Sequence, residues 1–582
     1  MSMETKAFRL PYGESNFEYL RENDYIYVDK TRFIEKLEYE KKVIYLRPRR
    51  FGKSLFLSML SCFYDVEKHD KFDMLFKGLD IYENTTTPHN HLYVMHFDFS
   101  GIPTKNMDVI EAGFAGIVKT SIENFAFKYG FDIELKRDDK PSAMLNQILS
   151  LVENKEERCS VCILIDEYDH FTNAVLENGM SDFLTLVKRG GMVRSFYEII
   201  KKFYGTGLIE RYFITGVMPV SLDSMTSGFN ISRNLTTDAK FAQMMGFTKD
   251  EVKTVLNLPF KFNQNDVIKL NEDEQHRLFD VFRENYNGYL FSPKSQNRVF
   301  NSTLIIYYFS EFFPHKISPD YLVDVNLNQS ANTITTLLNI ANADDNYRVI
   351  EELIEHKEII GSLSRTLDIV KKYDRDDFIT LMFNIGLLTI KESRMRTIFE
   401  IPNKVIESLY LSYLSDILQR RFEVKIDKNK QALAIEEMGF DGKLNQMTAL
   451  VENFLAHISY RNAVKFDEKY IKLIYRINLD SSNQYSVFDE LELGGGYADL
   501  VVLKTPASVA KYEFLIELKY LKKSEATPEK IQAEFEAGVK QIKQYASDKR
   551  MTSRSHLKKF VIVFVGYEAV RMEEVKEESE GI

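Results

Sequence analysis

Short apolar runs alternate with longer segments of helical periodicity over the first half of the chain. The runs are rich in β-branched and aromatic residues and read "KVIYL", "LYVMHFDFS", "VCILID" and "RYFITGVMPV". Segments between them, such as "SLFLSMLSCFY", repeat apolar residues every three or four positions, which is typical of a helix packed on a sheet. Buried strands that alternate with helices predict a parallel sheet with helices on both faces.

Two further apolar strands are predicted near the C-terminus. They lie in "GGGYADLVVLK" and "YEFLIELKYLKK", with the turn "TPASVA" between them, which favours an antiparallel pair. The region from about 296 to 430 has helical periodicity, as in "VIEELIEHKEIIGSL", and no recognisable chemical motif. We interpret it as a helical connector or a winged-helix-like segment.

Length and composition change this picture only by adding domains. The chain has 582 residues, 44% of them hydrophobic, and is too long to fold around a single hydrophobic core. Roughly two to four domains are therefore expected. No segment approaches the roughly 18 uninterrupted apolar residues of a membrane span, and the N-terminus has no apolar signal segment. We therefore expect a cytoplasmic protein that does not contact a membrane. A net charge of -10 argues against a general polyanion binder but allows local basic surface.

Two short motifs resemble metal sites but lack the residues that would complete one. Cys159 and Cys162 form a C-x-x-C without a second pair, and they and Cys62 are the only cysteines. We interpret them as structural thiols in a reducing compartment. The "HNH" at 89–91 has no supporting array of acidic residues or cysteines, so a solvated loop is the better interpretation.

The first chemical signal is Gly52-Lys53-Ser54, which lies between a predicted strand and a predicted helix. Free N–H groups at a helix start point toward a bound phosphate, a lysine neutralises β- and γ-phosphates, and a serine hydroxyl can ligate Mg²⁺. The first glycine of G-x-x-x-x-G-K-[ST] is missing, because Arg47 takes its place. The triplet alone is therefore a weak signal.

The residues that would complete a nucleotide-hydrolysing site follow in order. Asp166 and Glu167 end an apolar strand, where an aspartate can hold Mg²⁺ and a glutamate can deprotonate water. Thr215 ends a later strand, where it could sense a γ-phosphate. Singly, the acidic pair could be a solvated strand end and Thr215 a turn residue. Their order and spacing together favour ATP binding.

Several of these strings resemble the AAA-ATPase-like family, which is found chiefly in bacteria. They are "YLRPRRFGKSLFLSML", "LIDEYD", "FITGV", "SGFN", "MMGFTKDEV" and "YNGYLF", and they cover roughly residues 5 to 295. In this family an arginine-rich loop replaces the usual first glycine. The resemblance implies a P-loop domain with a helical lid and the cofactors ATP and Mg²⁺, with Ser54 and Asp166 at the metal. The implied nucleotide-binding residues are Arg49, Arg50, Phe51, Gly52, Lys53, Ser54, Asp166 and Thr215. Transition-state charge could come from Arg49, Arg50, Arg211 or Arg233.

In that family a nuclease-like domain commonly follows the ATPase. Asp499 lies in the first C-terminal strand, and Glu517 and Lys519 lie two residues apart in the second, so that they share one face. Asp499 and Glu517 could hold a divalent metal while Lys519 assists the nucleophile. Acidic residues inside apolar strands are costly unless they are paired or metal-bound. This arrangement resembles the D…E-x-K pattern of the PD-(D/E)XK nuclease superfamily.

Three more residues fit that resemblance as catalytic support. Glu468 lies on a predicted helix before the sheet, and Gln541 and Tyr545 fall four apart on one helix face, as in the Q-x-x-x-Y element of the RecB-like branch. A basic run follows, which could track a phosphate backbone, but a solvated helix face is the favoured interpretation. Its members are Lys540, Lys543, Lys549, Arg550, Arg554, Lys558 and Lys559.

The sequence as a whole predicts an α/β protein with two catalytic parts. We expect a P-loop ATPase domain over 5–295, a helical connector over 296–430 and a PD-(D/E)XK nuclease-like domain over 431–575. The nucleotide state would regulate a Mg²⁺-dependent nuclease acting on nucleic acid, with DNA favoured, and on foreign or mobile DNA in particular. A homo-oligomer is left open. One alternative is an ATP-driven conformational switch whose C-terminal domain binds nucleic acid or protein without cutting it. Another is a pseudo-ATPase, whose altered loop binds nucleotide without turnover.

Overall fold

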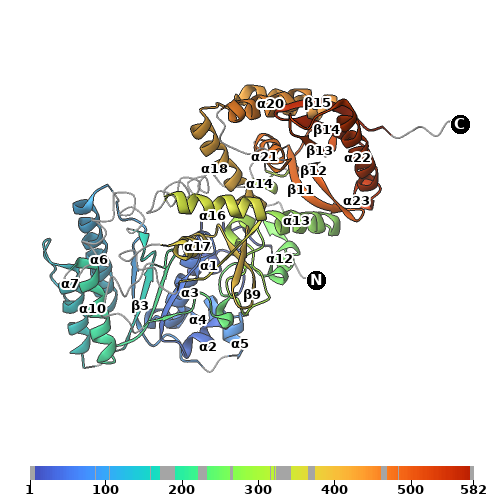
Figure 1. Ribbon diagram of the computed structural model, residues 1–582. Helices are drawn as coiled ribbons and strands as arrows, with labels where there is room; N and C mark the ends of the chain where they lie inside the picture. The colour runs from blue at the N-terminus through green and yellow to red at the C-terminus, as the bar shows by residue number, and fades with distance from the viewer. Residues whose placement is uncertain are drawn as a thin grey trace, which may run out of the picture. The chain divides into compact units, whose positions relative to one another are not determined.

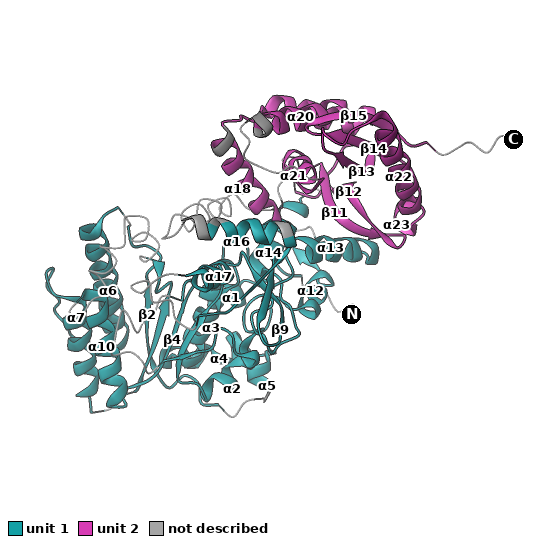
Figure 2. Ribbon diagram, in the orientation of Figure 1, with its two compact units in different colours: residues 1–315, 332–406 teal, residues 316–331, 407–582 magenta. Residues whose placement is uncertain are grey.

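The structure is a computed structural model of the chain, shown in Figure 1. It describes residues 7–576 except 85–86, 104, 157–158, 171–190, 220–231, 262–266, 315, 320–321, 323–342, 365–373, 461–467, 481 and 483. The chain divides into two compact units, coloured separately in Figure 2. Unit 1 comprises residues 1–315 and 332–406, and unit 2 comprises 316–331 and 407–582.

Unit 1 is built on a five-stranded parallel sheet. The strands are β1 (Lys42–Leu46), β2 (Tyr93–Asp98), β3 (Val161–Asp166), β4 (Ile209–Gly216) and the short β5 (Arg233–Asn234). The first four confirm the predicted strands and their parallel pairing. Their order in the sheet is β2-β3-β4-β1-β5. The strand that separates the phosphate loop from the acidic strand along the chain, β2, therefore lies at the sheet edge, and β4 lies between β1 and β3.

Helices flank this sheet and bury its apolar side chains. The long ones are α3 (Lys53–Tyr64), α6 (Met107–Tyr129), α7 (Pro141–Glu153) and α10 (Met192–Gly205). In Figure 1, α6, α7 and α10 lie together as one layer beside β2 and β3. Shorter helices are α1 (Phe17–Glu22), α2 (Arg32–Glu38), η1 (Val66–Lys71), α4 (Phe72–Phe76) and α5 (Asp80–Asn84). The β-strands are short and apolar because both faces are covered.

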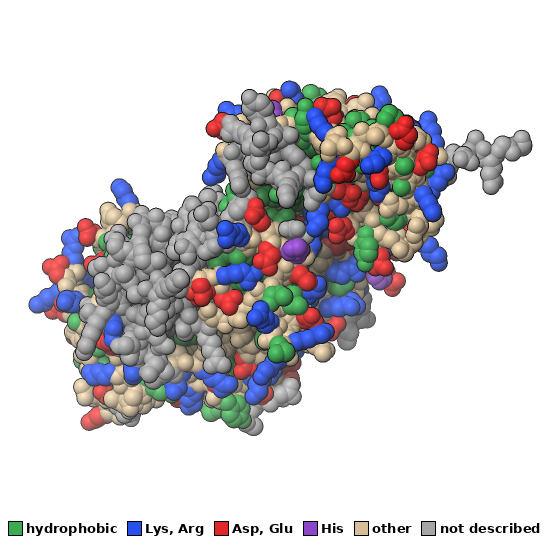
Figure 3. Space-filling model, in the orientation of Figure 1, with side chains coloured by type: hydrophobic (Ala, Val, Ile, Leu, Met, Phe, Trp, Pro, Cys, Tyr) green, Lys and Arg blue, Asp and Glu red, His purple; other side chains and the backbone are tan. Residues whose placement is uncertain are grey.

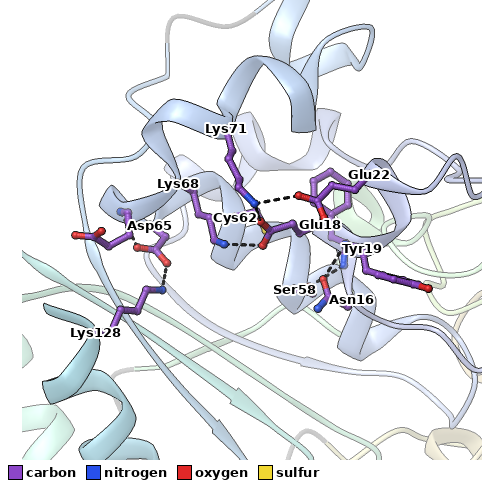
Figure 4. Close-up of polar contacts among 12 residues, drawn as sticks. Asn16, Glu18, Tyr19, Glu22, Ser58, Cys62, Asp65, Lys68, Lys71 and Lys128 are labelled. Carbon is purple, nitrogen blue, oxygen red and sulfur yellow. Dashed lines mark hydrogen bonds and ion pairs between the residues drawn. The ribbon is translucent and has the colours of Figure 1, made fainter.

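A polar cluster fastens the C-terminal end of α3 to its neighbours, as Figure 4 shows. Glu18 of α1 accepts Lys68 at 2.5 Å and Lys71 at 2.6 Å. Asp65, which caps η1, is fully buried and pairs with Lys128 of α6. Buried aspartate is stable only when its charge is compensated in this way. The cluster therefore orients α3, whose other end begins at the phosphate loop.

Neither metal-like motif forms a metal site among the described residues, and the "HNH" packs against the protein instead of forming the solvated loop that the sequence predicts. The His89 ring stacks on Phe72, with centroids 3.5 Å apart, and Asn90 is buried and donates to the carbonyls of Cys62 and Asp65. All three cysteines are free, and burial raises the pKa of Cys162 to about 12. A thiol with that pKa stays protonated and is a poor ligand and nucleophile.

The region predicted as a helical connector is not purely helical. It contains α14 (Ser302–Phe312), α16 (Ala343–His356) and α17 (Arg375–Asn384), together with the strands β8 (Glu358–Gly361), β9 (Thr389–Ser393) and β10 (Thr397–Glu400). These strands form an antiparallel sheet in the order β8-β10-β9. The helices α14, α16 and α17 together with this antiparallel sheet fit the winged-helix-like alternative. The segment "EIIGSL" was read as helix because a four-residue strand carries no distinct period.

Along the chain, the elements between the parallel sheet and this region fall where the sequence predicts a helical lid. They are η2 (Ala239–Phe241), α12 (Lys249–Leu256), β6 (Phe260–Lys261), β7 (Val267–Ile268) and α13 (Glu272–Asn285). Thr248 and Asn271 begin α12 and α13 with capping boxes, in which Glu251 and Glu274 bond back to the cap residues. No helix among the described residues is long and apolar enough to cross a membrane.

Unit 2 is a mixed sheet with helices. Its strands β11 (Tyr485–Leu493), β12 (Gly496–Lys504), β13 (Glu513–Leu521), β14 (Leu557–Val565) and β15 (Glu568–Glu574) are neighbours in that order, and only β13 and β14 are parallel. The predicted antiparallel pair, β12 and β13, is confirmed. The helices are α18 (Lys404–Phe422), α19 (Lys428–Glu436), η4 (Glu437–Asp441), α20 (Asn445–Tyr460), α21 (Glu468–Leu479), α22 (Pro528–Ala546) and α23 (Lys549–Thr552).

Candidate active sites

The phosphate loop lies where the sequence predicts it, between β1 and α3. Gly52 caps α3 in the left-handed region at φ 87°, and Arg50 is also left-handed at φ 72°. Glycine adopts this conformation at no steric cost, whereas an arginine does so only where its surroundings hold it. The loop therefore turns sharply into the N-terminus of α3.

Arg47, in the place of the usual first glycine, is a structural residue. It is 1% exposed, and its guanidinium lies 4.1 Å from the ring centres of both Tyr45 and Phe291. It donates to the carbonyls of Leu46 and Thr236, each at 2.8 Å. Burial lowers the pKa of Arg47 to about 10, which still leaves it charged at neutral pH. The cation ties the start of the loop to two distant segments.

The same distant segments support the rest of the loop. Phe51 packs edge-on against Tyr289 and Phe291 of "YNGYLF", with ring centres 4.9 and 5.3 Å apart. Its carbonyl accepts the Gly246 N–H of "MMGF" at 3.0 Å. A Cβ on Gly246 would lie 2.9 Å from the Phe300 carbonyl oxygen, so this close approach requires glycine. The loop is therefore assembled from side chains far apart in sequence.

Lys53 and the acidic strand end meet at this loop. The Lys53 ammonium is buried and donates to the carbonyls of Arg47 at 3.2 Å and Pro48 at 3.1 Å. Burial lowers the pKa of Lys53, against the attraction of Glu167 and Asp166. Burial raises the pKa of the Asp166 carboxylate, and the neighbouring Ser54 hydroxyl and Lys53 ammonium oppose that rise. The groups predicted to contact phosphate and metal therefore lie together.

Glu167 and His170 complete this edge of the sheet. Glu167 is left-handed at φ 46°, and its carboxylate lies 3.4 Å from Nδ1 of His170. The contact with His170 holds the pKa of Glu167 below its usual range, although burial opposes it. A non-glycine residue in this conformation costs about 1–3 kcal/mol and is found mostly at functional sites. Sequence reasoning missed His170, although "DEYDH" contains it.

In unit 2, Asp499 and Glu517 face each other across β12 and β13. The last backbone pair between these strands is Leu500 with Ile516, and Asp499 comes next. Its Oδ2 accepts the Leu518 N–H at 2.8 Å, in place of a backbone carbonyl. Lys519 donates to Glu517 Oε1 at 2.9 Å, as expected for residues on one strand face. The predicted convergence of these three side chains is present.

Two helices complete the unit 2 cluster. Glu468 is the first residue of α21, and burial and the charge of nearby Asp499 raise its pKa, against the attraction of Lys472. Lys472, one turn later, lies 3.1 Å from Asp499 and 3.6 Å from Glu468. Gln541 donates to the Tyr545 hydroxyl at 3.4 Å on α22. Lys472 was missed by sequence reasoning, although its spacing of four from Glu468 is the signal that could have found it.

Comparison with known families agrees with the predicted order of the two domains. A family model described as "Predicted AAA-ATPase" matches residues 11–226, and one described as "PD-(D/E)XK nuclease superfamily" matches residues 466–574. The chain joins an AAA-ATPase-like region to a PD-(D/E)XK nuclease superfamily domain. Both resemblances seen in the sequence are therefore confirmed. The string "SGFN" lies outside the described residues.

Individual relatives add little to this assignment. The "Uncharacterized protein in vnfD 5'region" of Azotobacter chroococcum mcd 1 is 28% identical over 334 residues, 54% of this chain and 56% of that protein. The match thus spans about half the length of that relative. A solved structure, "Structure of the Aeropyrum Pernix ORC2 protein (ADPNP-ADP complexes)", covers 71% of this chain and 98% of its own, at 12% identity and a TM-score of 0.29. A TM-score that low carries no argument.

A cavity of about 520 Å³ adjoins the phosphate loop of the AAA-ATPase-like region. One part of its wall consists of loop residues with Glu167 and His170, and another part is mainly apolar. The apolar part includes Ile26, Tyr27, Val28, Met244 and Met245. Ligand cavities of this size combine apolar walls with a few polar groups. The volume and lining suit a molecule with a phosphate end and a flat apolar end.

The structure separates the four candidate arginines. Arg49 and Arg50 line the cavity. Arg211 is buried near the start of β4, where it pairs with Glu38 at 2.5 Å, and Arg233 is paired with Glu40. Because Arg211 lies five residues, about 16 Å of strand, from the loop end of β4, it cannot reach the loop. Thr215 is fully buried, and its hydroxyl donates to the Tyr45 carbonyl at 2.9 Å, so that hydroxyl is engaged within the sheet.

Asp169 links the strings "LIDEYD" and "FITGV". It is 2% exposed and accepts the N–H groups of Val217 and Met218. A Cβ on Gly216 would lie 2.1 Å from Asp169 Oδ1. We expect Gly216→Ala to lower the free energy of unfolding by about 1–3 kcal/mol, measured by denaturant titration. Gly205→Ala is the control, because no atom lies within 4 Å of its Cβ position. Equal stability of the two variants would contradict this account.

Glu517 should make the stability of the nuclease superfamily domain depend on pH. Burial and the charge of Asp499 raise its pKa from 4.5 to about 7, against the attraction of Lys519. The folded chain therefore keeps a proton that the unfolded chain has released, so stability from this group is full below about pH 4.5 and is lost as pH rises through 7. The loss should be on the order of 3 kcal/mol.

Chemical unfolding at several pH values, with a chelator present, measures this loss. Glu517→Gln should flatten the dependence, because the amide has no proton to lose. Glu568→Gln, at an exposed carboxyl of the same unit, should leave it unchanged. A wild-type profile that rises between pH 5 and 7 in the same way as the Glu517→Gln profile would contradict the assignment.

The carboxylates of unit 2 suit a divalent cation in their chemistry. Glu517 Oε2 is buried and has no hydrogen-bond partner, as expected of an oxygen that awaits a cation. Asp499 and Glu517 would supply hard oxygen ligands. Among the described residues, however, no group of three or more His, Cys, Asp or Glu side chains is arranged to hold a metal. A cation here would therefore be held by two carboxylates and by non-protein ligands.

The basic run near α22 is a charged surface with many internal pairs. Arg550 pairs with Asp548 at 2.9 Å, Arg554 with Glu513 at 2.6 Å and Lys558 with Glu574 at 2.8 Å. On the face drawn in Figure 3, acidic and basic side chains are mixed over the described surface. These contacts favour the interpretation of a solvated surface over that of a phosphate track.

Proposed function

We propose that the chain hydrolyses ATP in its AAA-ATPase-like region and cuts phosphodiester bonds of DNA in its nuclease superfamily domain. The observation that carries the proposal is an arrangement of side chains that occurs in both units. In each unit a lysine faces a pair of carboxylates, with Lys53 near Asp166 and Glu167, and Lys519 beside Glu517 near Asp499. Clusters of buried titratable groups with perturbed pKa values are typical of catalytic sites.

In the ATPase site, each described side chain has a role that its position supports. Lys53 would neutralise the phosphates, and Ser54 and Asp166 would hold Mg²⁺, which supplies further neutralisation when bound. Glu167, kept ionised by His170, would accept a proton from the attacking water. Arg49 and Arg50 line the cavity from the loop and would contact phosphate oxygens. The apolar wall would receive the base.

In the nuclease site, Asp499 and Glu517 would hold a divalent cation, which activates water and neutralises charge on the phosphate when bound. Lys519 would position the nucleophile, and Glu468 would support the geometry of the site next to Asp499. Gln541 and Tyr545 bond to each other on α22 and would contact the substrate backbone. We further propose that nucleotide state regulates cutting and that foreign or mobile DNA is the target. Self-association into a homo-oligomer and a cytoplasmic location stay predictions.

The full chain tests the proposal in two assays. Phosphate release from ATP should require Mg²⁺, and supercoiled and linear DNA should be cut with Mg²⁺ or Mn²⁺. The cutting rate should differ severalfold between ATP, ADP and no nucleotide. Phosphate release without any cutting would favour the non-cleaving switch. One observation favours that alternative, because Lys472 already neutralises Asp499 at 3.1 Å without a metal.

A further inference from the structure

We propose that Lys472 is a built-in counter-cation of the nuclease site, whose ammonium competes with a divalent metal for Asp499. The inference rests on the proposed metal role of Asp499 and Glu517. The Lys472 side chain is 10% exposed and lies within ion-pair distance of three carboxylates. The distances are 3.1 Å to Asp499, 3.4 Å to Glu490 and 3.6 Å to Glu468. A buried ammonium is retained only where carboxylates compensate it in this way.

Both oxygens of Asp499 already have a partner, and the partner of Oδ1 is a cation. Oδ2 accepts the Leu518 N–H, which belongs to the β12–β13 ladder, and Oδ1 accepts Lys472. Glu517 differs, because Lys519 engages only Oε1 and Oε2 has no partner. A cation held by Asp499 and Glu517 would therefore compete with the Lys472 ammonium for the Asp499 carboxylate. Two positive charges cannot share Asp499 Oδ1 because they repel strongly at such distances.

Glu490 provides an acceptor to which the displaced ammonium can turn. Within β11 it is left-handed at φ 54°, a strained conformation for glutamate. The register of β11 on β12 passes from Asp489–Leu500 to Leu491–Ala498, so Glu490 is the skipped residue opposite Asp499. Its side chain is 58% exposed yet reaches Lys472. The backbone of β11 therefore places the Glu490 carboxylate beside the Lys472 ammonium, on its solvent-exposed side.

Removing the Lys472 charge should tighten metal binding. We expect Lys472→Gln to bind Mn²⁺ at least tenfold more tightly than wild type, since no ammonium must be displaced. In chelator the variant should melt at a lower temperature, because three carboxylates lose their counter-cation. Mn²⁺ should raise its melting temperature by more than it raises that of wild type.

Isothermal titration of the full chain with Mn²⁺, without nucleotide or DNA, measures this affinity. Asp499→Asn identifies the heat that belongs to the nuclease site and separates it from binding at Asp166. Lys469→Gln is the charge-matched control, because this exposed lysine lies on the same helix. Its affinity should stay within twofold of wild type.

The outcomes separate this inference from the proposed function. The inference is supported if Asp499-dependent Mn²⁺ binding is tighter in Lys472→Gln than in wild type and Lys469→Gln. It is also supported if Lys472→Gln binds Mn²⁺ and wild type shows no measurable binding. Equal or weaker binding in Lys472→Gln overturns it and leaves the proposed metal site intact. Absence of Asp499-dependent binding in both proteins overturns both. If Lys472→Gln does not fold, Lys472→Arg keeps the cation and should bind Mn²⁺ no more tightly than wild type, and tighter binding would overturn the inference.

Discussion

Glu167→Gln should abolish ATP turnover while leaving ATP binding intact. The contact with His170 holds the pKa of Glu167 low despite burial, and Lys53 and Arg49 add to this effect. The residue is therefore a carboxylate at neutral pH and can accept a proton from water. Glutamine keeps the shape but cannot accept a proton, and loss of a general base typically costs 10²–10⁴-fold in rate.

Two measurements on the full chain separate catalysis from binding for this variant. Phosphate release should fall by about 10²-fold or more, whereas the affinity for a fluorescent ATP analogue should change little. Glu123→Gln, on the exposed face of α6, controls for loss of a carboxylate elsewhere in the unit. Turnover within tenfold of wild type would show that another group activates the water.

Asp499→Asn should abolish DNA cutting, with an expected fall in rate of about 10³-fold or more, the scale of a lost metal or general-base function. The substitution is chosen because an amide oxygen still accepts the Leu518 N–H, so the β12–β13 ladder can persist. The amide has no charge to hold a cation or to pair with Lys472. A structural defect should therefore be small compared with the loss of cutting.

Supercoiled DNA with Mn²⁺ is the most sensitive substrate for this test, since a single cut changes its mobility. Asp441→Asn, an exposed aspartate in the same unit, is the matched control and should cut at the wild-type rate. Equal cutting by Asp499→Asn and wild type would place the active site elsewhere. If all three proteins are inert while ATP turnover persists, the C-terminal domain is a non-cleaving binding module.

The two sites also differ in how they compensate their charges. In the ATPase-like region the Lys53 ammonium rests on two backbone carbonyls, so an incoming phosphate would exchange neutral partners for an anionic one. In the nuclease superfamily domain Lys472 and Lys519 are already ion-paired with carboxylates. Ion pairs in a low-dielectric site must be broken or rearranged before a metal enters. We therefore expect nucleotide binding to need less rearrangement than metal binding.

The local sequence pattern by itself determined several strands and the positions of several candidate site residues. The strands β1, β3, β12 and β13 were predictable because apolar runs of strand length have few other ways to be buried. Gly52-Lys53-Ser54 was placed at a strand-to-helix turn because period and glycine position agree there. Glu517 and Lys519 meet because side chains two apart on a strand share a face. These are short-range consequences of backbone geometry.

Only the tertiary structure decided which partner each polar atom takes. Arg47 is held by Tyr45 and Phe291, the Thr215 hydroxyl turns into the sheet, and β4 lies between β1 and β3. Lys472 reaches Asp499, 27 residues away along the chain. Such contacts join segments whose separation in sequence carries no period, so local pattern cannot specify them. They depend on the packing of whole elements, which also buries these groups and shifts their pKa values.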